Sequence, residues 1–120
     1  MSITHVRVKI GAGKRALTVR FLVDTGAVYS VLPETLWRRL RLRPSRTLEF
    51  VLADGTAIRR GVSECRFTVA GHTATSPVVL GGPTDAALLG AVTLETLGLM
   101  VNPLSREVLP MRLPLTALTA

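Results

Sequence analysis

One aspartate in this sequence stands where acid–base chemistry is possible. Three hydrophobic residues typical of a β-strand, at positions 21–23, run directly into Asp24, which opens the turn sequence Asp-Thr-Gly-Ala. A second apolar segment follows at residues 29–32. A carboxylate held between two buried strands is costly unless it is hydrogen-bonded, paired or protonated. Asp24 is therefore a candidate catalytic residue, because such carboxylates gather at functional sites.

The tripeptide Asp24-Thr25-Gly26 also has a purely structural explanation. Asp side chains cap turns and Gly accepts a positive φ, so Asp-Thr-Gly is a common turn sequence. The tripeptide predicts a turn and, by itself, leaves open whether the aspartate reacts.

Other catalytic chemistries find little support in the residue types present. The lone Cys65 lies in a strand pattern, where a packed thiol is expected, and it cannot form an internal disulfide. Together with His5 and His72, Cys65 does not form any of the sequence spacings that are typical of metal ligands. The sequence contains no Gly-x-Ser-x-Gly elbow and no glycine-rich phosphate loop. We expect neither a metal nor a cofactor.

A second motif lies further along the chain. Residues 87–90 read Ala-Leu-Leu-Gly, again an apolar run that is closed by glycine and followed by a short helical pattern. Together the two stretches resemble the retropepsin-like aspartic proteases, the family of the retroviral proteases and their bacterial relatives, over residues 6–109. In that family the Asp-Thr-Gly-Ala loop carries the catalytic aspartate, and a hydrophobic-hydrophobic-Gly segment crosses behind it as a ψ-shaped loop.

The resemblance implies a role for each matching position. Asp24 is the implied catalytic residue. The residues implied to support the active-site loop and the dimer are Thr25, Gly26, Ala27 and Ser30. The residues implied to support this loop from below, in the ψ-loop, are Leu88, Leu89 and Gly90. The tip of the implied flap, a hairpin that folds over bound substrate, consists of Ala53, Asp54 and Gly55. One departure concerns substrate binding, because Val28-Tyr29 stand where the retroviral enzymes carry an acidic residue that holds substrate backbone.

The implied chemistry requires two carboxylates that share a proton, one acting as general base and the other as hydrogen-bond donor. The chain has three aspartates, and neither Asp54 nor Asp85 carries an Asp-Thr/Ser-Gly signature. The second carboxylate is therefore expected from another copy, in a twofold homodimer. In the retroviral family the terminal strands interleave at that interface, and residues 108–113 are the candidate segment here.

Periodicity predicts many short strands and two small helices. We expect strands at residues 6–10, 16–23, 29–32, 48–52, 57–69, 74–80, 86–89, 99–101 and 107–113, and helices at 33–42 and 91–97. Gly98 is expected to end the second helix in the left-handed conformation. The pattern predicts a mainly antiparallel β-barrel in a single domain of residues 1–120, with 114–120 as a loose tail.

The charge is strongly positive, with a formal net value of +7 and thirteen arginines. The densest group comprises Arg38, Arg39, Arg41, Arg43 and Arg46. It could contact phosphates or acidic substrates, or form a solvated helix face. Without interleaved aromatic residues, nucleic-acid binding is not expected as the main function. The chain has no membrane-spanning apolar run and no signal-peptide pattern, so a cytoplasmic protein is predicted.

Three functions remain to be distinguished. The first is a homodimeric aspartic endopeptidase that acts on peptide or protein substrates. The second is a catalytically idle module of the same fold that binds or dimerises, since fold alone does not guarantee activity. The third is a basic, nucleic-acid-binding barrel. The intact Asp24-Thr25-Gly26 favours the first.

Overall fold

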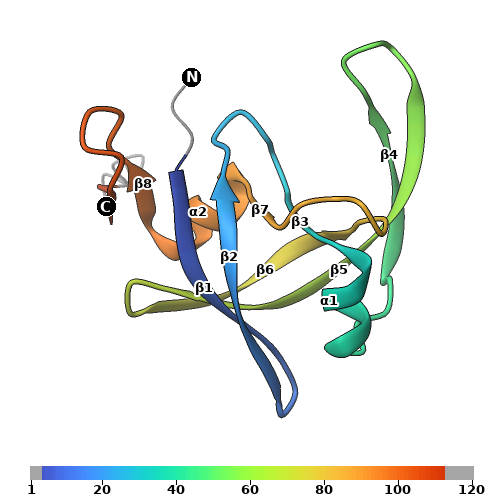
Figure 1. Ribbon diagram of the computed structural model, residues 1–120, viewed down its shortest axis with the longest axis horizontal. Helices are drawn as coiled ribbons and strands as arrows, with labels where there is room; N and C mark the ends of the chain where they lie inside the picture. Colours follow the sequence, from blue (N-terminus) through green and yellow to red (C-terminus); the bar gives the residue numbers. More distant parts are fainter. Residues whose placement is uncertain (1–3, 113–120) are drawn as a thin grey trace, which may run out of the picture.

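The computed structural model describes residues 4–112, which form nine strands and two short helices (Figure 1). The elements are β1 (Thr4–Ala12), β2 (Arg15–Val23), β3 (Ser30–Leu32), α1 (Glu34–Arg39), β4 (Arg46–Val51), β5 (Ala57–Val69), β6 (His72–Leu80), β7 (Leu88–Leu89), α2 (Ala91–Leu97), β8 (Leu99–Val101) and β9 (Val108–Pro110). The mainly β fold with two short helices confirms the predicted class.

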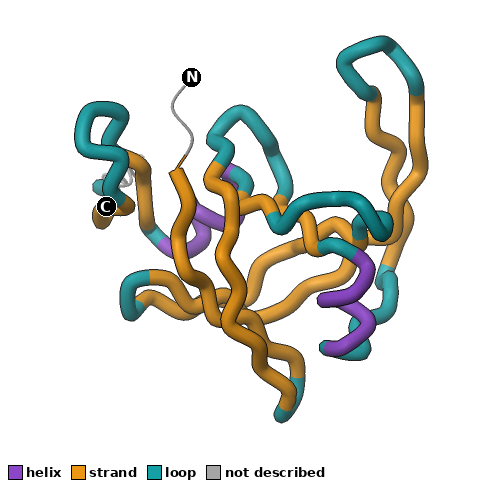
Figure 2. The backbone as a smooth tube through the Cα atoms, viewed as in Figure 1, coloured by secondary structure: helices purple, strands orange, loops and turns teal. Residues whose placement is uncertain are grey.

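Seven strands form one sheet in the order β1-β2-β7-β3-β6-β5-β4 (Figure 2). An additional pairing between β1 and β5 closes six of them into a ring, with β4 continuing outward from β5. Along each strand every second side chain points into this ring. Val8 and Ile10 do so on β1, and both are fully buried. At its centre Phe21 and Phe67 pack edge to face, with ring centroids 6.0 Å apart.

The short strand β7 gives the sheet its ψ-shaped crossing. It runs parallel to β2, pairing Leu88 with Leu22, and antiparallel to β3, pairing the same leucine with Val31. The pairing of β3 with β6 is also parallel. The sheet is mainly antiparallel, as predicted, with two parallel pairings that the sequence did not indicate. The β3–β6 pairing arises because the chain leaves β3, builds α1 and the β4–β5 hairpin, and returns beside it. The β2–β7 pairing arises in the same way, because all elements from β3 to β6 lie between those two strands in the sequence. The strand predicted at 86–89 is limited to β7.

The first helix is shorter than predicted. α1 ends at Arg39, with Leu40 as its C-cap, and Arg41 adopts the left-handed conformation with φ 56°. The N–H of Leu42 bonds to the carbonyl of Trp37, and that of Arg41 to the carbonyl of Arg38, which is the Schellman pattern. The reversal turns Leu42 into the core. α2 ends at Gly98 with φ 72°, as predicted.

The C-terminal strands form a separate two-stranded sheet. β9 pairs antiparallel with β8 of the same chain, and this hairpin lies beside the start of β1 (Figure 1). The strand predicted at 107–113 is therefore observed over 108–110 and is already paired within its own chain. The predicted loose tail, 114–120, lies outside the described residues. Neither α1 nor α2 is long enough to cross a bilayer.

Candidate active site

The Asp24 loop is anchored by backbone hydrogen bonds at both ends. The N–H of Asp24 donates to the carbonyl of Leu89 at 3.0 Å, which fixes the end of β2 against β7. Within the loop, the N–H of Gly26 donates to Oδ1 of Asp24 at 2.9 Å, and the N–H of Ala27 donates to the carbonyl of Asp24 at 3.1 Å. The aspartate thus both caps its own turn and presents a carboxylate.

The loop is more open than the sequence predicted. Phe21 and Ser30 on the flanking strands are fully buried, but Asp24 is only half-buried and Thr25 is exposed. The prediction of a buried carboxylate is therefore wrong for the single chain. The physical reason is that the barrel covers one side of the loop and leaves the other side to solvent.

Within residues 4–112, the other two aspartates are engaged in turns of their own. Oδ1 of Asp54 accepts the N–H of Thr56 at 2.8 Å, and Oδ2 of Asp85 accepts the N–H of Gly82 at 2.7 Å. These two aspartates cap turns, as Asx residues commonly do. A two-carboxylate site would require a second molecule.

The ψ-loop is packed against the Asp24 loop too closely for a side chain at position 90. A Cβ at Gly90 would lie 2.5 Å from the carbonyl carbon of Tyr29. Behind Gly90, the first N–H groups of α2 donate to the loop: Ala91 to the carbonyl of Ala27 at 2.8 Å, and Val92 to that of Val28 at 2.9 Å. These donors have no partner inside their own helix, so they fix the loop without weakening the helix.

Three fully buried hydroxyls lie behind the loop: Ser30, which the resemblance singled out, and two that sequence reasoning missed, Thr93 and Ser76. The N–H of Gly90 donates to Oγ of Ser30 at 3.0 Å, and Ser30 contacts the hydroxyl of Thr93. Thr93 contacts Ser76 at 2.8 Å, and Ser76 donates to the carbonyl of Pro77 at 3.2 Å.

The backbone groups at the two ends of this hydrogen-bonded series, the N–H of Gly90 and the carbonyl of Pro77, determine which atom each hydroxyl donates to. Ser76 uses its proton on a carbonyl, so it must accept from Thr93. Thr93 then accepts from Ser30, which in turn accepts from the N–H of Gly90. Each hydroxyl donates once and accepts once, which polarises the chain cooperatively. The available sequence signal was a small hydroxyl at a core-facing position of a helix or strand.

The predicted flap is the β4–β5 hairpin, which projects away from the ring (Figure 1). Its tip contains Ala53, Asp54 and Gly55, as predicted, but the structure does not bring these residues to the Asp24 loop. Hydrogen bonds from the side chain and backbone N–H of Thr56 hold the pKa of Asp54 below its usual range.

The outer part of the hairpin, one residue pair below its turn, nevertheless touches the active-site loop. The ring of Phe50 on β4 packs edge to face on Tyr29, with centroids 6.2 Å apart. Beside this contact lies a mainly apolar cavity of about 230 Å³. Its lining residues are Val31, Phe50, Ile58, Arg60, Val79, Asp85, Ala86 and Leu88.

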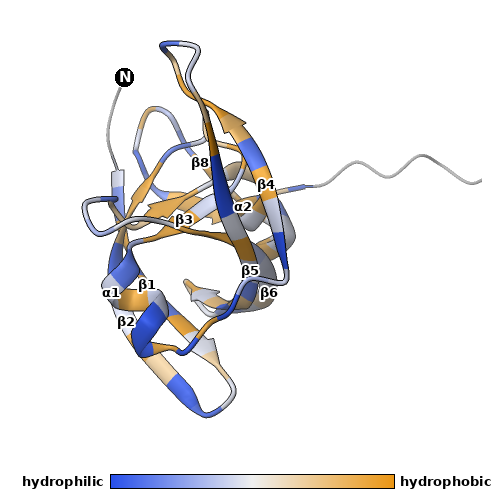
Figure 3. Cartoon of the chain, turned by 90° about the vertical axis from the view of Figure 1, so that its right-hand side faces the viewer, coloured by the Kyte–Doolittle hydropathy of each residue, from blue (hydrophilic) through white to orange (hydrophobic). Residues whose placement is uncertain are grey.

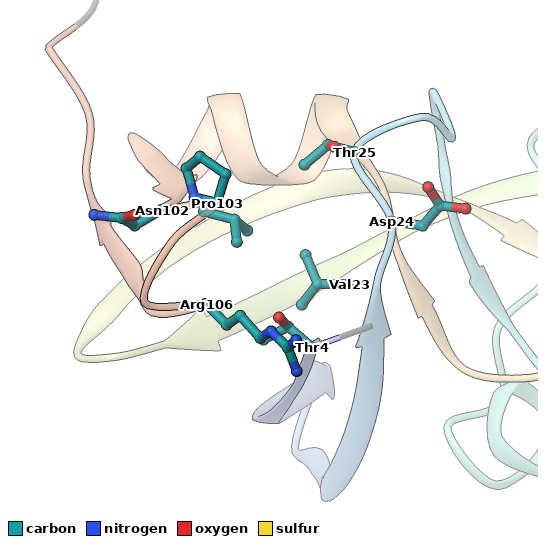
Figure 4. Close-up of a pocket in the computed structure, with 8 residues that line it drawn as sticks. Thr4, Val23, Asp24, Thr25, Asn102, Pro103 and Arg106 are labelled. Atoms are coloured by element: carbon teal, nitrogen blue, oxygen red, sulfur yellow. The ribbon is translucent and has the colours of Figure 1, made fainter. Parts of the chain in front are cut away.

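A second hollow, of about 200 Å³, lies between the end of β2 and the β8–β9 turn and includes Asp24 and Thr25 in its lining. Arg106 extends across it toward Thr4, whereas the carboxylate of Asp24 points to the other side of its loop (Figure 4). This hollow therefore adjoins the loop but does not receive the carboxylate.

Cys65 and the metal-ligating residue types form no further site in the part of the chain that the structure describes. Burial raises the pKa of the Cys65 thiol to about 12, which keeps it protonated and agrees with the predicted packed thiol. Among residues 4–112, no three His, Cys, Asp or Glu side chains gather as a metal site.

A closed ring of strands, in which an Asp-Thr-Gly-Ala loop is tied to a ψ-loop, defines the fold of the retroviral proteases. The EIAV protease, solved in complex with the inhibitor HBY-793, matches with a TM-score of 0.63 and 21% identity, over 81% of this chain and 89% of that one. The solution structure of the simian foamy virus (mac) protease matches with a TM-score of 0.58 and 21% identity, over 77% of this chain and 92% of that one.

The family follows from the sequence itself. A family model described as Aspartyl protease matches residues 6–100. The chain belongs to this aspartyl protease family and has the fold of the retroviral proteases, as the resemblance implied. No curated protein sequence shows a significant match.

Proposed function

We propose that this protein is an aspartic endopeptidase that is active as a homodimer. The observation that carries the proposal is the Asp24 loop itself: its carboxylate is presented on a hydrogen-bonded turn, and the face beside it is open. Symmetry would bring Asp24 of two copies together, and two close carboxylates hold one proton between them. The ionised one takes a proton from water as the water attacks the peptide carbonyl. The protonated one donates to the carbonyl oxygen, which gives a tetrahedral intermediate. The carboxyl that took the proton from water then passes it to the amide nitrogen as the C–N bond breaks, and the other carboxylate takes back the proton that it gave to the oxygen, so that the amine and the carboxylic acid leave.

The surface around Thr25 supports a second copy at this face. An apolar hollow of about 240 Å³ adjoins this threonine, with lining residues that include Leu94, Met100 and Met111. Three large hydrophobic side chains lie exposed nearby in the chain's loops and strands: Val28 on the Asp24 loop, Met100 on β8, and Leu104, which is 93% exposed, in the β8–β9 turn. Exposed apolar surface of this kind is typical of an interface.

The C-terminal hairpin suggests how the two copies meet. Because β9 pairs with β8 in the same chain, each copy has a preformed two-stranded sheet, and within the described residues the other edge of β8 has no strand partner. A free edge is a template for pairing with another chain. We propose that two β8 edges pair across the twofold axis, in place of the interleaved termini that the resemblance implied.

Substrate would lie as an extended peptide between the Asp24 loop and the β4–β5 hairpin. The cavity beside the outer half of this hairpin is large enough for one apolar side chain, and the Tyr29–Phe50 contact holds this part of the hairpin beside the loop.

Cleavage of an unfolded-protein mixture by concentrated wild type and by Asp24→Asn tests the proposal. From about pH 3 to pH 7, we expect a bell-shaped profile for wild type and a loss of about 10³-fold or more in the variant. Asp54→Asn is the matched control, because it removes the same charge yet keeps an acceptor for Thr56.

Equal cleavage by wild type and Asp24→Asn would contradict the proposal. An absence of cleavage by a protein shown to be dimeric would instead support the idle binding or dimerisation module.

A further inference from the structure

The outward face of the β1–β2 hairpin carries cations in register. Arg7 and Lys9 on β1 are exposed, as is Arg20 on β2, and Arg7 lies directly opposite Arg20. Like charges at directly opposed positions destabilise a strand pair. The only salt bridge within residues 4–112 is the one on α1, so none of these three cations is neutralised by a neighbouring acid.

The cations continue onto the neighbouring strand. Lys14 and Arg66 join Lys9 around a hollow of about 390 Å³ at the far end of the hairpin. Nη2 of Arg66 donates to the carbonyl of Gly13 at 2.8 Å. The guanidinium lies over Gly11, where a Cβ would come within 2.7 Å of it, so the glycine leaves the space that Arg66 occupies.

We call Arg7, Lys9, Lys14, Arg20 and Arg66 the cationic face. In Figure 3 the turn end of the β1–β2 hairpin is coloured as hydrophilic. Glu64, on β5 two residues before Arg66, is an acidic neighbour, yet it forms no ion pair within the described residues.

Strand register places the cationic face on the same side of the sheet as the cavity beside the Asp24 loop. Leu22 follows Arg20 by two residues and so points to the same side, and it pairs with Leu88. Leu88 pairs with Val31, and Val31 pairs with Val79. The last three of these residues line the cavity, so an extended polypeptide could leave the cavity along this side of the sheet.

The distance along β2 sets how far a substrate would have to reach. Arg20 precedes Asp24 by four residues, and Lys9 lies opposite Thr18, two residues further back. At about 3.4 Å per residue, the Arg7–Arg20 pair lies roughly 14 Å from the aspartate and the Lys9–Thr18 pair roughly 20 Å from it. An extended substrate rises at the same rate, so its side chains would meet these two pairs about four to six residues from the scissile bond.

We propose that the cationic face is a secondary docking surface for acidic residues of the substrate, about four to six positions from the scissile bond. This inference rests on the proposed endopeptidase function. Carboxylates form charge-assisted hydrogen bonds with guanidinium and ammonium groups. Nucleic acid fits less well, because the five residues of the face include no aromatic ring for base stacking, and the face continues into a cavity suited to a peptide side chain.

Paired peptide substrates test the proposal. One set carries Glu at the fourth and sixth positions on either side of an apolar cleavable core, and the other carries Gln there. At low salt we expect kcat/KM for the better Glu peptide to exceed that for its Gln counterpart by about five- to tenfold, through KM, and the advantage to disappear near 0.5 M salt as charges are screened.

Two double variants with equal loss of charge identify the surface responsible. In Arg7→Ser/Arg20→Ser the Glu-to-Gln ratio should fall to about one. In Arg39→Ser/Arg43→Ser, which removes two exposed cations at α1 and the segment after it, the ratio should stay at the wild-type value. Equal cleavage of Glu and Gln peptides by wild type, or an equal loss of preference in both variants, would overturn the proposal.

A binding measurement separates this proposal from the catalytic one. Fluorescence anisotropy of the same peptides on Asp24→Asn requires no cleavage. A Glu preference that depends on Arg7 and Arg20, together with no cleavage by wild type, would retain the docking surface and reject the endopeptidase. A 20-base-pair DNA duplex could instead displace the bound Glu peptide at a lower concentration than unlabelled Glu peptide does. If that displacement also depended on Arg7 and Arg20, the acidic-substrate assignment would be rejected in favour of nucleic acid.

Discussion

Thr93 links the two ends of the hydroxyl chain behind the Asp24 loop. It is fully buried and is the single donor to Ser76 and acceptor from Ser30 that the proton directions allow. Ser30 in turn accepts the N–H of Gly90, so the chain connects the ψ-loop, β3, α2 and β6 at one point. Thr93 is therefore a positioning residue for the proposed site, acting through Ser30 and Gly90.

We expect Thr93→Val to lower the free energy of unfolding by about 1–3 kcal/mol, because valine fills the same space but leaves the Ser30 hydroxyl proton without an acceptor. Thr93→Ser keeps the hydroxyl and should therefore retain the hydrogen bonds to Ser30 and Ser76. Urea denaturation measures the first effect. In cleavage assays the valine variant should lose kcat with little change in KM, and the serine variant should recover it. Equal behaviour of the two variants would show that the hydroxyl has no positioning role.

Among the elements, the β4–β5 hairpin depends on its own tip. Its turn is held by Asp54, which accepts the N–H of Thr56, and by the bond from the N–H of Gly55 to the carbonyl of Leu52 at 2.9 Å. The tip is fully exposed, so these local bonds, and not packing, define its conformation.

The hairpin tip should loosen in acid. Hydrogen bonds from Thr56 lower the pKa of Asp54 from 3.8, so the bonded carboxylate stabilises the turn above that pH. This contribution is lost as the pH falls through the lower, folded-state value. The amide resonance of Thr56, followed by NMR, should therefore titrate with a midpoint below 3.8, and in Asp54→Asn it should not titrate in this range. A midpoint at or above 3.8 would contradict the bonded turn.

Element boundaries followed the sequence closely where local signals were strong. The turn at Gly13, the end of α2 at Gly98 and the long strand β5 lie where glycine positions and alternation predicted them. α1 stopped early because an arginine took the left-handed position that usually belongs to glycine, a choice that burial of Leu42 stabilises.

For the whole molecule, the proposed activity requires association. In the described part of one chain, Asp54 and Asp85 cap turns of their own and so do not pair with Asp24, and Met100 and Leu104 are exposed. Specific activity should therefore rise with protein concentration up to the dimer dissociation constant and level off above it. The single domain over residues 1–120 and the cytoplasmic location stay predictions.

Met100→Glu should weaken the dimer by about tenfold or more, because it places a charge in the apolar face around Thr25. Sedimentation equilibrium measures the dissociation constant directly. Val51→Glu is the matched control, since it makes the same type of change at an exposed apolar position on the β4–β5 hairpin and should leave association unchanged. Equal dimer stability in wild type and Met100→Glu would place the interface on another surface.

Local pattern in the sequence was enough to determine the strands, both helices, the catalytic candidate Asp24 and the fold, because periodicity and turn chemistry act over a few residues and two motifs carried the family resemblance. Tertiary structure alone decided the parallel pairings of β7 and β3, the pairing of β9 within its own chain, and the openness of the Asp24 loop. It also joined Ser30 to Thr93, 63 residues apart in the sequence. These features depend on contacts between segments distant in the chain, which no local pattern specifies.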